Sequence, residues 1–209
     1  MLPSSIHPRR IPCQERGERR VAELIDAAEA VIAETGYEGA TMSAIAERAG
    51  ASIGSLYQFF PNKAAITLAL RAHYGEQFDA VCEPLSEQAR SLNLQEFVSR
   101  LIDITIHFVD SHPAFLALLD APSSTRRPAS RNPLRERFAG FFLAQQPRIA
   151  KPKAMQLAMV TMHIMKALNQ LYTELAPAER RSFIQEFKLV LYSYLNARLE
   201  PRRIRRVQP

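Results

Sequence analysis

The chain has 209 residues, a formal net charge of +6 and a pI of about 9.6. This length suffices for one or two domains with a hydrophobic core, and the positive charge favours an anionic partner. The sequence has no apolar run of the roughly 18 residues that a membrane-spanning helix needs, and no secretion signal, so we expect a cytoplasmic protein. Cys13 and Cys82 fit no metal or redox spacing, and we expect reduced thiols, no metal and no cofactor.

Positive charge is concentrated at the two ends of the chain. We assign residues 1–17 to a basic arm and residues 201–209 to a basic tail. Residues 21–63, in contrast, contain two basic and six acidic side chains. The arginines at the ends are Arg9, Arg10, Arg16, Arg19, Arg20, Arg198, Arg202, Arg203, Arg205 and Arg206. The arm could reach phosphates or a minor groove, or it could be a solvated terminus.

An amphipathic helix with an apolar stripe from Val21 to Ile32 is expected to end at Gly36. The next segment, Thr41 to Lys63, predicts two short helices around a tight turn at Gly50, where a left-handed conformation is expected. Thr41 is expected to cap a helix over 42–49, and Ser52 is expected to cap a helix over about 53–59. Asn62 is expected to cap a third helix that starts at about 63. Such a pair of helices is typical of a helix-turn-helix DNA reader.

The same segment also fits a different motif. Gly50-Ala51-Ser52-Ile53-Gly54 matches G-x-S-x-G, the nucleophile elbow of α/β-hydrolases, which would make Ser52 a nucleophile. That elbow needs a buried strand directly before it, whereas the preceding residues favour a helix. The hydrolase reading is therefore the weaker alternative, and we assign no catalytic residue.

The remainder of the chain predicts further helices and no strand, so the expected fold class is all-α. The helix from about 63 carries an apolar stripe up to Pro84, and Asn93 is expected to cap a helix over 94–111. Shorter helices are expected over 114–119 and from Pro133, separated by a Pro/Ser/Arg loop over 121–132. The last two helices, about 153–175 and 178–199, are apolar on more than one face, which favours burial in a homodimeric four-helix interface over a thicker monomer core.

Residues 37–74 resemble the DNA-binding domain of the tetracycline-repressor (TetR) family of transcription regulators. The matching residues are Gly36, Tyr37, Thr41, Ile45, Ala46, Ala49, Gly50, Ser52, Gly54, Leu56, Tyr57, Phe60, Asn62 and Lys63. The resemblance implies an N-terminal three-helix helix-turn-helix domain, which we place at 18–65. It also implies a helical ligand-binding and dimerisation domain, which we place at 66–200.

The resemblance further implies a set of DNA contacts: Ser43, Ser52, Ile53, Gly54, Ser55, Tyr57, Gln58 and Lys63. Gln58 is the best candidate for a base-edge hydrogen bond, and Tyr57 and Lys63 for phosphate contacts. Two positions depart from the family pattern. Phe59 replaces a frequent polar residue, and Ile53 replaces a frequent basic one, so that Ile53 could touch a thymine methyl group. Tyr57 and Phe59 could alternatively be core residues of a three-helix bundle.

A small-molecule effector is also implied by the resemblance. Candidate pocket residues are the aromatic and sulfur-containing side chains of the second domain with one histidine: Phe108, Phe115, Phe138, Phe141, Phe142, Met159, Met162 and His163. Each of them could instead be ordinary core. We therefore expect a dimeric DNA-binding regulator, a repressor of a palindromic operator that an apolar or aromatic ligand releases. The alternative is a helical ligand-binding protein that does not bind DNA.

Overall fold

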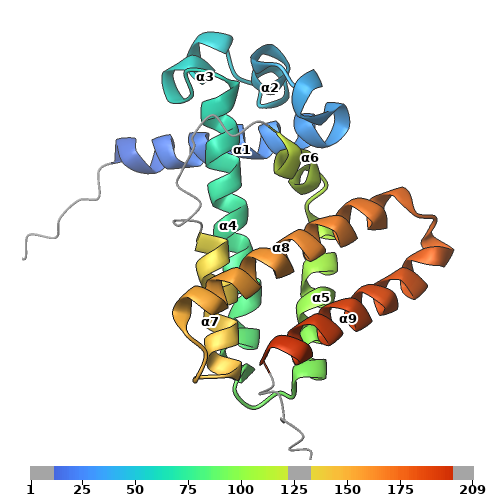
Figure 1. Cartoon of the computed structure of the whole chain (residues 1–209). Coiled ribbons are helices and arrows are strands. Elements are labelled where there is room, and N and C mark those ends of the chain that lie inside the picture. The colour runs from blue at the N-terminus through green and yellow to red at the C-terminus, as the bar shows by residue number, and fades with distance from the viewer. Residues whose placement is uncertain (1–11, 122–132, 200–209) are drawn as a thin grey trace, which may run out of the picture. The chain divides into compact units, whose positions relative to one another are not determined.

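The computed structural model describes residues 12–121 and 133–199, and these form helices joined by short connections (Figure 1). The helices are α1 (Pro12–Gly39), α2 (Met42–Arg48), α3 (Ile53–Phe59), α4 (Lys63–Gln88), α5 (Leu94–Ser111), α6 (Ala114–Asp120), α7 (Pro133–Gln145), α8 (Lys151–Glu174) and α9 (Pro177–Leu199). The all-α prediction is confirmed. No helix among the described residues combines the length and hydropathy needed to cross a membrane.

The chain divides into two compact units. One comprises residues 1–72 and 117–121, and the other comprises residues 73–116 and 122–209. Two boundaries fall inside helices α4 and α6, so each of these helices contributes to both units.

The first unit packs α1, α2, α3 and the start of α4 around an aliphatic core. Leu24, Ile32, Ile45, Leu56 and Ile66 are fully buried there. The core-facing positions of α1 recur every three or four residues, as the sequence pattern predicted. Because α2 and α3 are only seven residues long, they depend on this packing and on their caps rather than on helix propensity.

Helix α1 differs from the prediction at both ends. It begins at Pro12, so residues 12–17, which we placed in the basic arm, are helical. A proline at the first helical position loses no hydrogen bond, and Glu15 in the first turn favours the helix dipole. At Gly36 the backbone takes φ 71° and kinks, and a final helical turn then reaches Gly39. Residues 1–11 of the predicted arm and the whole tail at 201–209 lie outside the described residues.

Helix α4 continues past the residue that was expected to end it. Pro84 lies inside the helix, which runs on to Gln88. A proline there removes one hydrogen bond of the helix, but Cys82, Leu85 and the following Ala89 are almost fully buried. Burial of these neighbours in the second unit therefore overrides the helix-breaking tendency of Pro84.

The second unit consists of the rest of α4, α5, residues 114–116 of α6, and α7 to α9. Helix α8 packs along α7, and α9 packs along α5. Its core includes Phe97, Leu101, Phe142, Leu157 and Leu195. The predicted cap of α5 is confirmed, because Asn93 Oδ1 accepts from the Glu96 amide at 2.9 Å. Helices α8 and α9 start slightly earlier than predicted, each with a proline in its first turn, where none of the helix's hydrogen bonds is lost.

Candidate DNA-reading surface

Helices α2 and α3 form two short, well-capped helices around a tight turn. Thr41 Oγ1 accepts from the Ala44 amide and Ser52 Oγ accepts from the Ser55 amide, both at 3.1 Å. Between the helices, Gly50 has φ 56°. The Gly50 amide donates to Glu47 O, and the Ala51 amide donates to Ala46 O. These two bonds define a Schellman ending for α2, so the predicted caps and the predicted left-handed glycine are confirmed.

The cap of Ser52 also decides against the nucleophile elbow. The segment before Gly50 is helix α2 rather than a strand, and the Ser52 hydroxyl is occupied as an N-cap. The N-cap role accounts for a serine at this position without a catalytic triad. The serine-hydrolase alternative is wrong in the structural context that it requires.

Most of the predicted DNA contacts are uncharged residues that are exposed on the surface formed by α2 and α3. Ser43, Ser52, Ile53, Gly54, Tyr57 and Gln58 are exposed and Ser55 is half-buried. Tyr57 is 50% exposed and Phe59 38% exposed, which excludes the alternative that these two aromatic residues belong to the core of this unit. The side chains that do fill the core are Leu56 and Phe60, as expected.

Gly54 lies on this surface, and neither its backbone conformation nor its packing requires a glycine. Its φ is not positive, and a Cβ added there would meet no atom within 4 Å. Glycine is unfavourable in a helix relative to alanine because it loses more backbone freedom on folding. The residue therefore fits a site where a partner approaches the backbone closely.

Lys63 is the predicted contact that behaves differently. Its ammonium group donates to Tyr37 O at 2.8 Å and to Glu38 O at 3.2 Å, and it lies 4.5 Å from the centre of the Tyr37 ring. Lys63 thus caps carbonyls near the end of α1 and ties α4 to α1. The sequence did not indicate this role.

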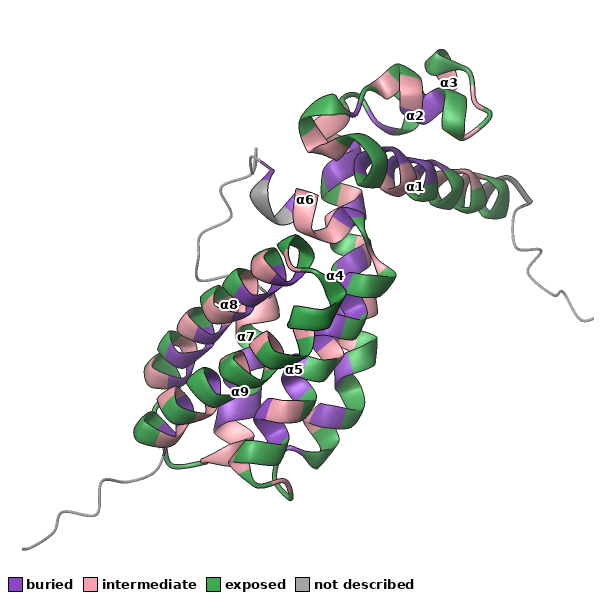
Figure 2. Cartoon of the chain, turned by 90° about the vertical axis from the view of Figure 1, so that its right-hand side faces the viewer, coloured by how far each residue is buried: buried purple, intermediate pink, exposed green. Residues whose placement is uncertain are grey.

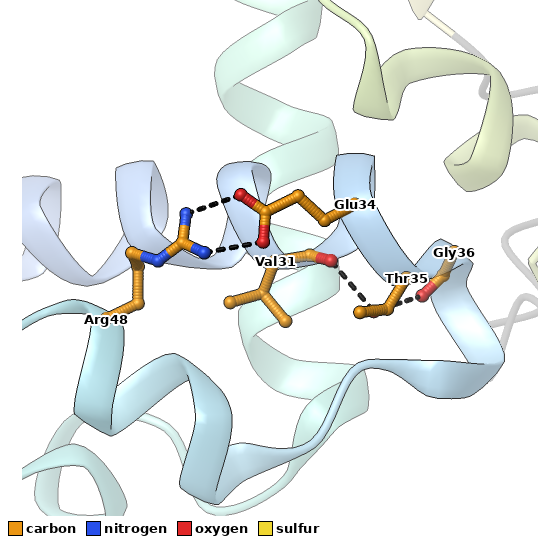
Figure 3. Close-up of polar contacts among 5 residues, drawn as sticks. All are labelled: Val31, Glu34, Thr35, Gly36 and Arg48. Atoms are coloured by element: carbon orange, nitrogen blue, oxygen red, sulfur yellow. Dashed lines mark hydrogen bonds and ion pairs between the residues drawn. The ribbon is translucent and has the colours of Figure 1, made fainter.

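The basic residue of α2, Arg48, is also engaged within the unit (Figure 3). Arg48 forms a bidentate pair with Glu34 of α1, with nitrogen–oxygen distances of 2.8 and 2.5 Å. The hydrogen bond from Arg48 holds the pKa of Glu34 below its ordinary value, and the guanidinium charge adds to this effect. The pair is exposed, so it orients α2 on α1 more than it stabilises the fold.

The predicted effector residues do not gather in one place. Phe108 and Phe115 join a cluster with Tyr74, Phe78 and His112, in which neighbouring ring centres are 4.4–6.1 Å apart. A second cluster consists of Phe97 with Phe138, Phe141 and Phe142. All but Phe115 of the predicted phenylalanines are at most 3% exposed, so they form core in this structure.

The remaining predicted effector residues lie on the outer side of α8. Met159 and His163 line an open apolar groove of about 560 Å³ between α8 and α9, and Met162 is half-buried nearby on the same helix. The other lining residues are Val160, Ile164, Ala167, Phe187 and Val190. Among the described residues no group of three potential metal ligands occurs.

Comparison with known proteins places both parts of the chain in one family. Residues 24–70 match the family "Bacterial regulatory proteins, tetR family", and residues 93–195 match "Tetracyclin repressor-like, C-terminal domain". The chain belongs to the TetR family. Its members are transcription regulators and not enzymes.

The curated relatives that match this TetR-family protein are aligned with about a third of the chain. The repressor KstR of Mycolicibacterium smegmatis is 35% identical over 66 residues, which is 32% of each chain. The fatty acid metabolism regulator of Bacillus subtilis is 38% identical over 68 residues, 32% of this chain and 35% of that one. The matches thus span about a third of each relative's length.

Solved structures of the family share the fold over most of the chain. A TetR-family regulator from Streptomyces coelicolor has a TM-score of 0.65 and 26% identity, covering 86% of this chain and 99% of that one. FadR from Bacillus subtilis in complex with stearoyl-CoA has a TM-score of 0.55 and 18% identity, covering 79% and 96%.

Proposed function

We propose that this TetR-family protein is a transcriptional repressor that binds a palindromic operator as a homodimer. The observation that supports the proposal is the exposed surface of α2 and α3. There, Ser43, Gln58 and Tyr57 offer hydrogen-bonding groups, while Gly54 leaves the helix backbone open. A helix of this kind presents such side chains to base edges in the major groove.

A gel shift with the DNA that flanks the protein's own coding region tests this function. We expect a sequence-selective complex that weakens as salt increases, because phosphate contacts release counterions. A protein that bound ligands but no DNA, which is the alternative function, would give no such complex at any concentration. The same assay with Gln58→Ala should show a relaxed base preference, whereas Tyr57→Phe should weaken binding to all sequences alike.

The homodimer is supported by apolar side chains that a single chain leaves uncovered. Leu189 and Val190 on α9 are 58% and 51% exposed, and Met159 on α8 is 40% exposed. A monomer core does not cover these residues. Two copies packed through α8 and α9 would cover them, and would supply the two reading helices that a palindromic site needs.

An apolar or aromatic effector is the third part of the proposal. The interior of the second unit is rich in aromatic rings, and it also holds buried polar atoms, Thr161 Oγ1 and Asn169 Oδ1, that find no hydrogen-bond partner among the described residues. Such atoms fit a ligand with a long apolar body and a few polar groups. Because one curated relative is named for fatty acid metabolism and a solved structure with the same fold holds stearoyl-CoA, acyl compounds are the first class to test for release of the DNA complex.

A further inference from the structure

The basic residues in and next to α2 and α3 form hydrogen bonds within the protein. Between positions 42 and 72 the chain has three of them, Arg48, Lys63 and Arg71. Arg48 pairs with Glu34, Lys63 donates to two carbonyls near the end of α1, and Arg71 donates to Leu118 O at 2.6 Å and Ala121 O at 2.8 Å. These bonds hold the three side chains against the protein, so basic residues without an internal partner are the first candidates for a further DNA anchor.

The N-terminal half of α1 runs beside α3, in both views of the chain (Figures 1 and 2). Arg20 fixes this arrangement. Its guanidinium donates to Ala49 O at 3.3 Å and to Gly50 O at 3.5 Å, in the turn that leads into α3. It also pairs with Glu23 at 2.7 Å, so Arg20 itself is engaged. The turn of α1 before Arg20 therefore flanks the reading helix.

Arg16 lies one helical turn before Arg20 and on the same face of α1, since residues four apart are neighbours along a helix. It is exposed, and within the described part of the chain it has neither a hydrogen-bond partner nor an ion-pair partner. Gly17 beside it would accept a Cβ without meeting any atom within 4 Å. This glycine thus leaves the backbone open next to a free guanidinium.

We propose that Arg16 is a phosphate anchor of the DNA complex, holding the DNA backbone beside the base-reading surface of α3. The inference rests on the proposed DNA binding and adds to it a residue outside the helix-turn-helix. Arg19 provides a matched comparison. It is also exposed and unpaired among the described residues, and it lies about 100° around α1 from Arg20 and about 60° from Arg16. It is therefore farther than Arg16 from the side of α1 that Arg20 turns toward residues 49 and 50.

The test measures how binding depends on salt. A duplex is first selected from a random-sequence library with the full-length protein, and fluorescence anisotropy then gives the affinity between about 50 and 200 mM KCl. Each phosphate contact contributes about 0.9 to the slope of log affinity against log salt concentration. We expect Arg16→Gln to lower the magnitude of this slope by about 0.9 for each bound protomer, Arg16→Lys to retain it, and Arg19→Gln to leave it unchanged.

A second measurement identifies the contact itself. Neutral methylphosphonate replaces single phosphates in the selected duplex, one position at a time. One position should weaken the wild-type complex and have no further effect on Arg16→Gln. Equal slope changes for Arg16→Gln and Arg19→Gln, or no position that couples to Arg16, would overturn the assignment. Failure of the wild-type protein to select any duplex would instead count against DNA binding itself.

Discussion

At Gly54, the residue that would favour DNA binding differs from the residue that would make the helix most stable. Nothing in the free protein requires glycine there. We expect Gly54→Ala to raise the free energy of unfolding by up to about 1 kcal/mol, because alanine loses less backbone freedom in a helix. The same methyl group should weaken operator binding. Urea unfolding and anisotropy titration measure the two effects on one variant.

Gly50→Ala is the matched control for this prediction. Gly50 has φ 56°, a left-handed conformation that costs an alanine about 1–2 kcal/mol. This variant should therefore lose stability, in contrast to Gly54→Ala. If Gly54→Ala also lost stability, or if it bound the operator as tightly as the wild type, the assignment of Gly54 to the DNA interface would be wrong.

Ile53 is a second exposed residue among the proposed DNA contacts. It is 41% exposed as the first residue of α3. An apolar side chain in the major groove recognises the 5-methyl group of thymine. Replacing one operator thymine by uracil should therefore weaken wild-type binding, by about 1 kcal/mol or less for a single methyl group. The same replacement should have no effect on Ile53→Ala. Anisotropy with each thymine replaced in turn locates the contact, and equal losses for both proteins at every position would refute it.

The residues that sequence reasoning identified best are those with local partners. The caps at Thr41, Ser52 and Asn62 all accept from an amide three residues ahead, so spacing alone predicted them. The role of Lys63 could not be predicted in this way. Its partners Tyr37 and Glu38 are 26 and 25 residues away in the sequence, and only the folding of α1 against α4 brings them together.

At the scale of elements, the ion pair between Glu34 of α1 and Arg48 of α2 makes a prediction about pH. Because the hydrogen bond from Arg48 lowers the pKa of Glu34 in the folded protein, the pair contributes stability above the ordinary pKa of 4.5, and this contribution is lost as pH falls through the lowered value. The stability difference between wild type and Glu34→Gln should therefore shrink when pH is lowered from 7 to below 4.5. Urea unfolding at a series of pH values measures it.

Glu47→Gln serves as the control for this pH series. Glu47 is exposed on the same helix as Arg48 and forms no ion pair with any described residue. Its variant keeps the pair between Glu34 and Arg48, so it should not reproduce the pH dependence expected for Glu34→Gln. If both variants followed the same pH dependence, the pairing of Glu34 with Arg48 would not be the cause.

Helix boundaries show where local sequence signals give way to packing. The start of α5 follows its asparagine cap, and the spacing of polar and apolar residues predicted it correctly. The end of α4 was predicted wrongly at Pro84, because a local rule cannot weigh the burial of Leu85 and Ala89 on the far side of the proline. The start of α1 was missed for a related reason, since its first turns carry charged residues and no apolar stripe.

For the whole molecule, the sequence predicted the fold class, but the residues that it grouped as one effector pocket do not lie together in the structure. Aromatic residues at helical spacing have the same pattern whether they line a cavity or fill a core. The structure separates the predicted effector residues into two buried aromatic clusters and one open groove. Only the three-dimensional packing of α4, α5 and α7 distinguishes these environments.

The groove between α8 and α9 leads to the prediction that concerns assembly. Val190 is half-exposed beside Phe187 in this groove and would be buried between two copies of the chain. A carboxylate buried there without a partner is strongly unfavourable, so Val190→Asp should convert the proposed dimer to a monomer. Analytical ultracentrifugation measures the change in mass. Operator affinity should fall with it, since each half-site would be bound by a separate molecule.

Gln185→Asp provides the control for this change, because Gln185 is exposed on α9 and does not line the groove. It adds the same charge to the same helix, and because it lies about 140° around α9 from Val190 it should disturb the proposed dimer less than Val190→Asp does. Circular dichroism should show unchanged helix content in both variants, since Val190 makes no part of the core of a single chain. A Val190→Asp protein that remained a dimer while binding its operator normally would place the interface elsewhere. Dissociation of both variants would point to general charge repulsion along α9 rather than to burial at the groove.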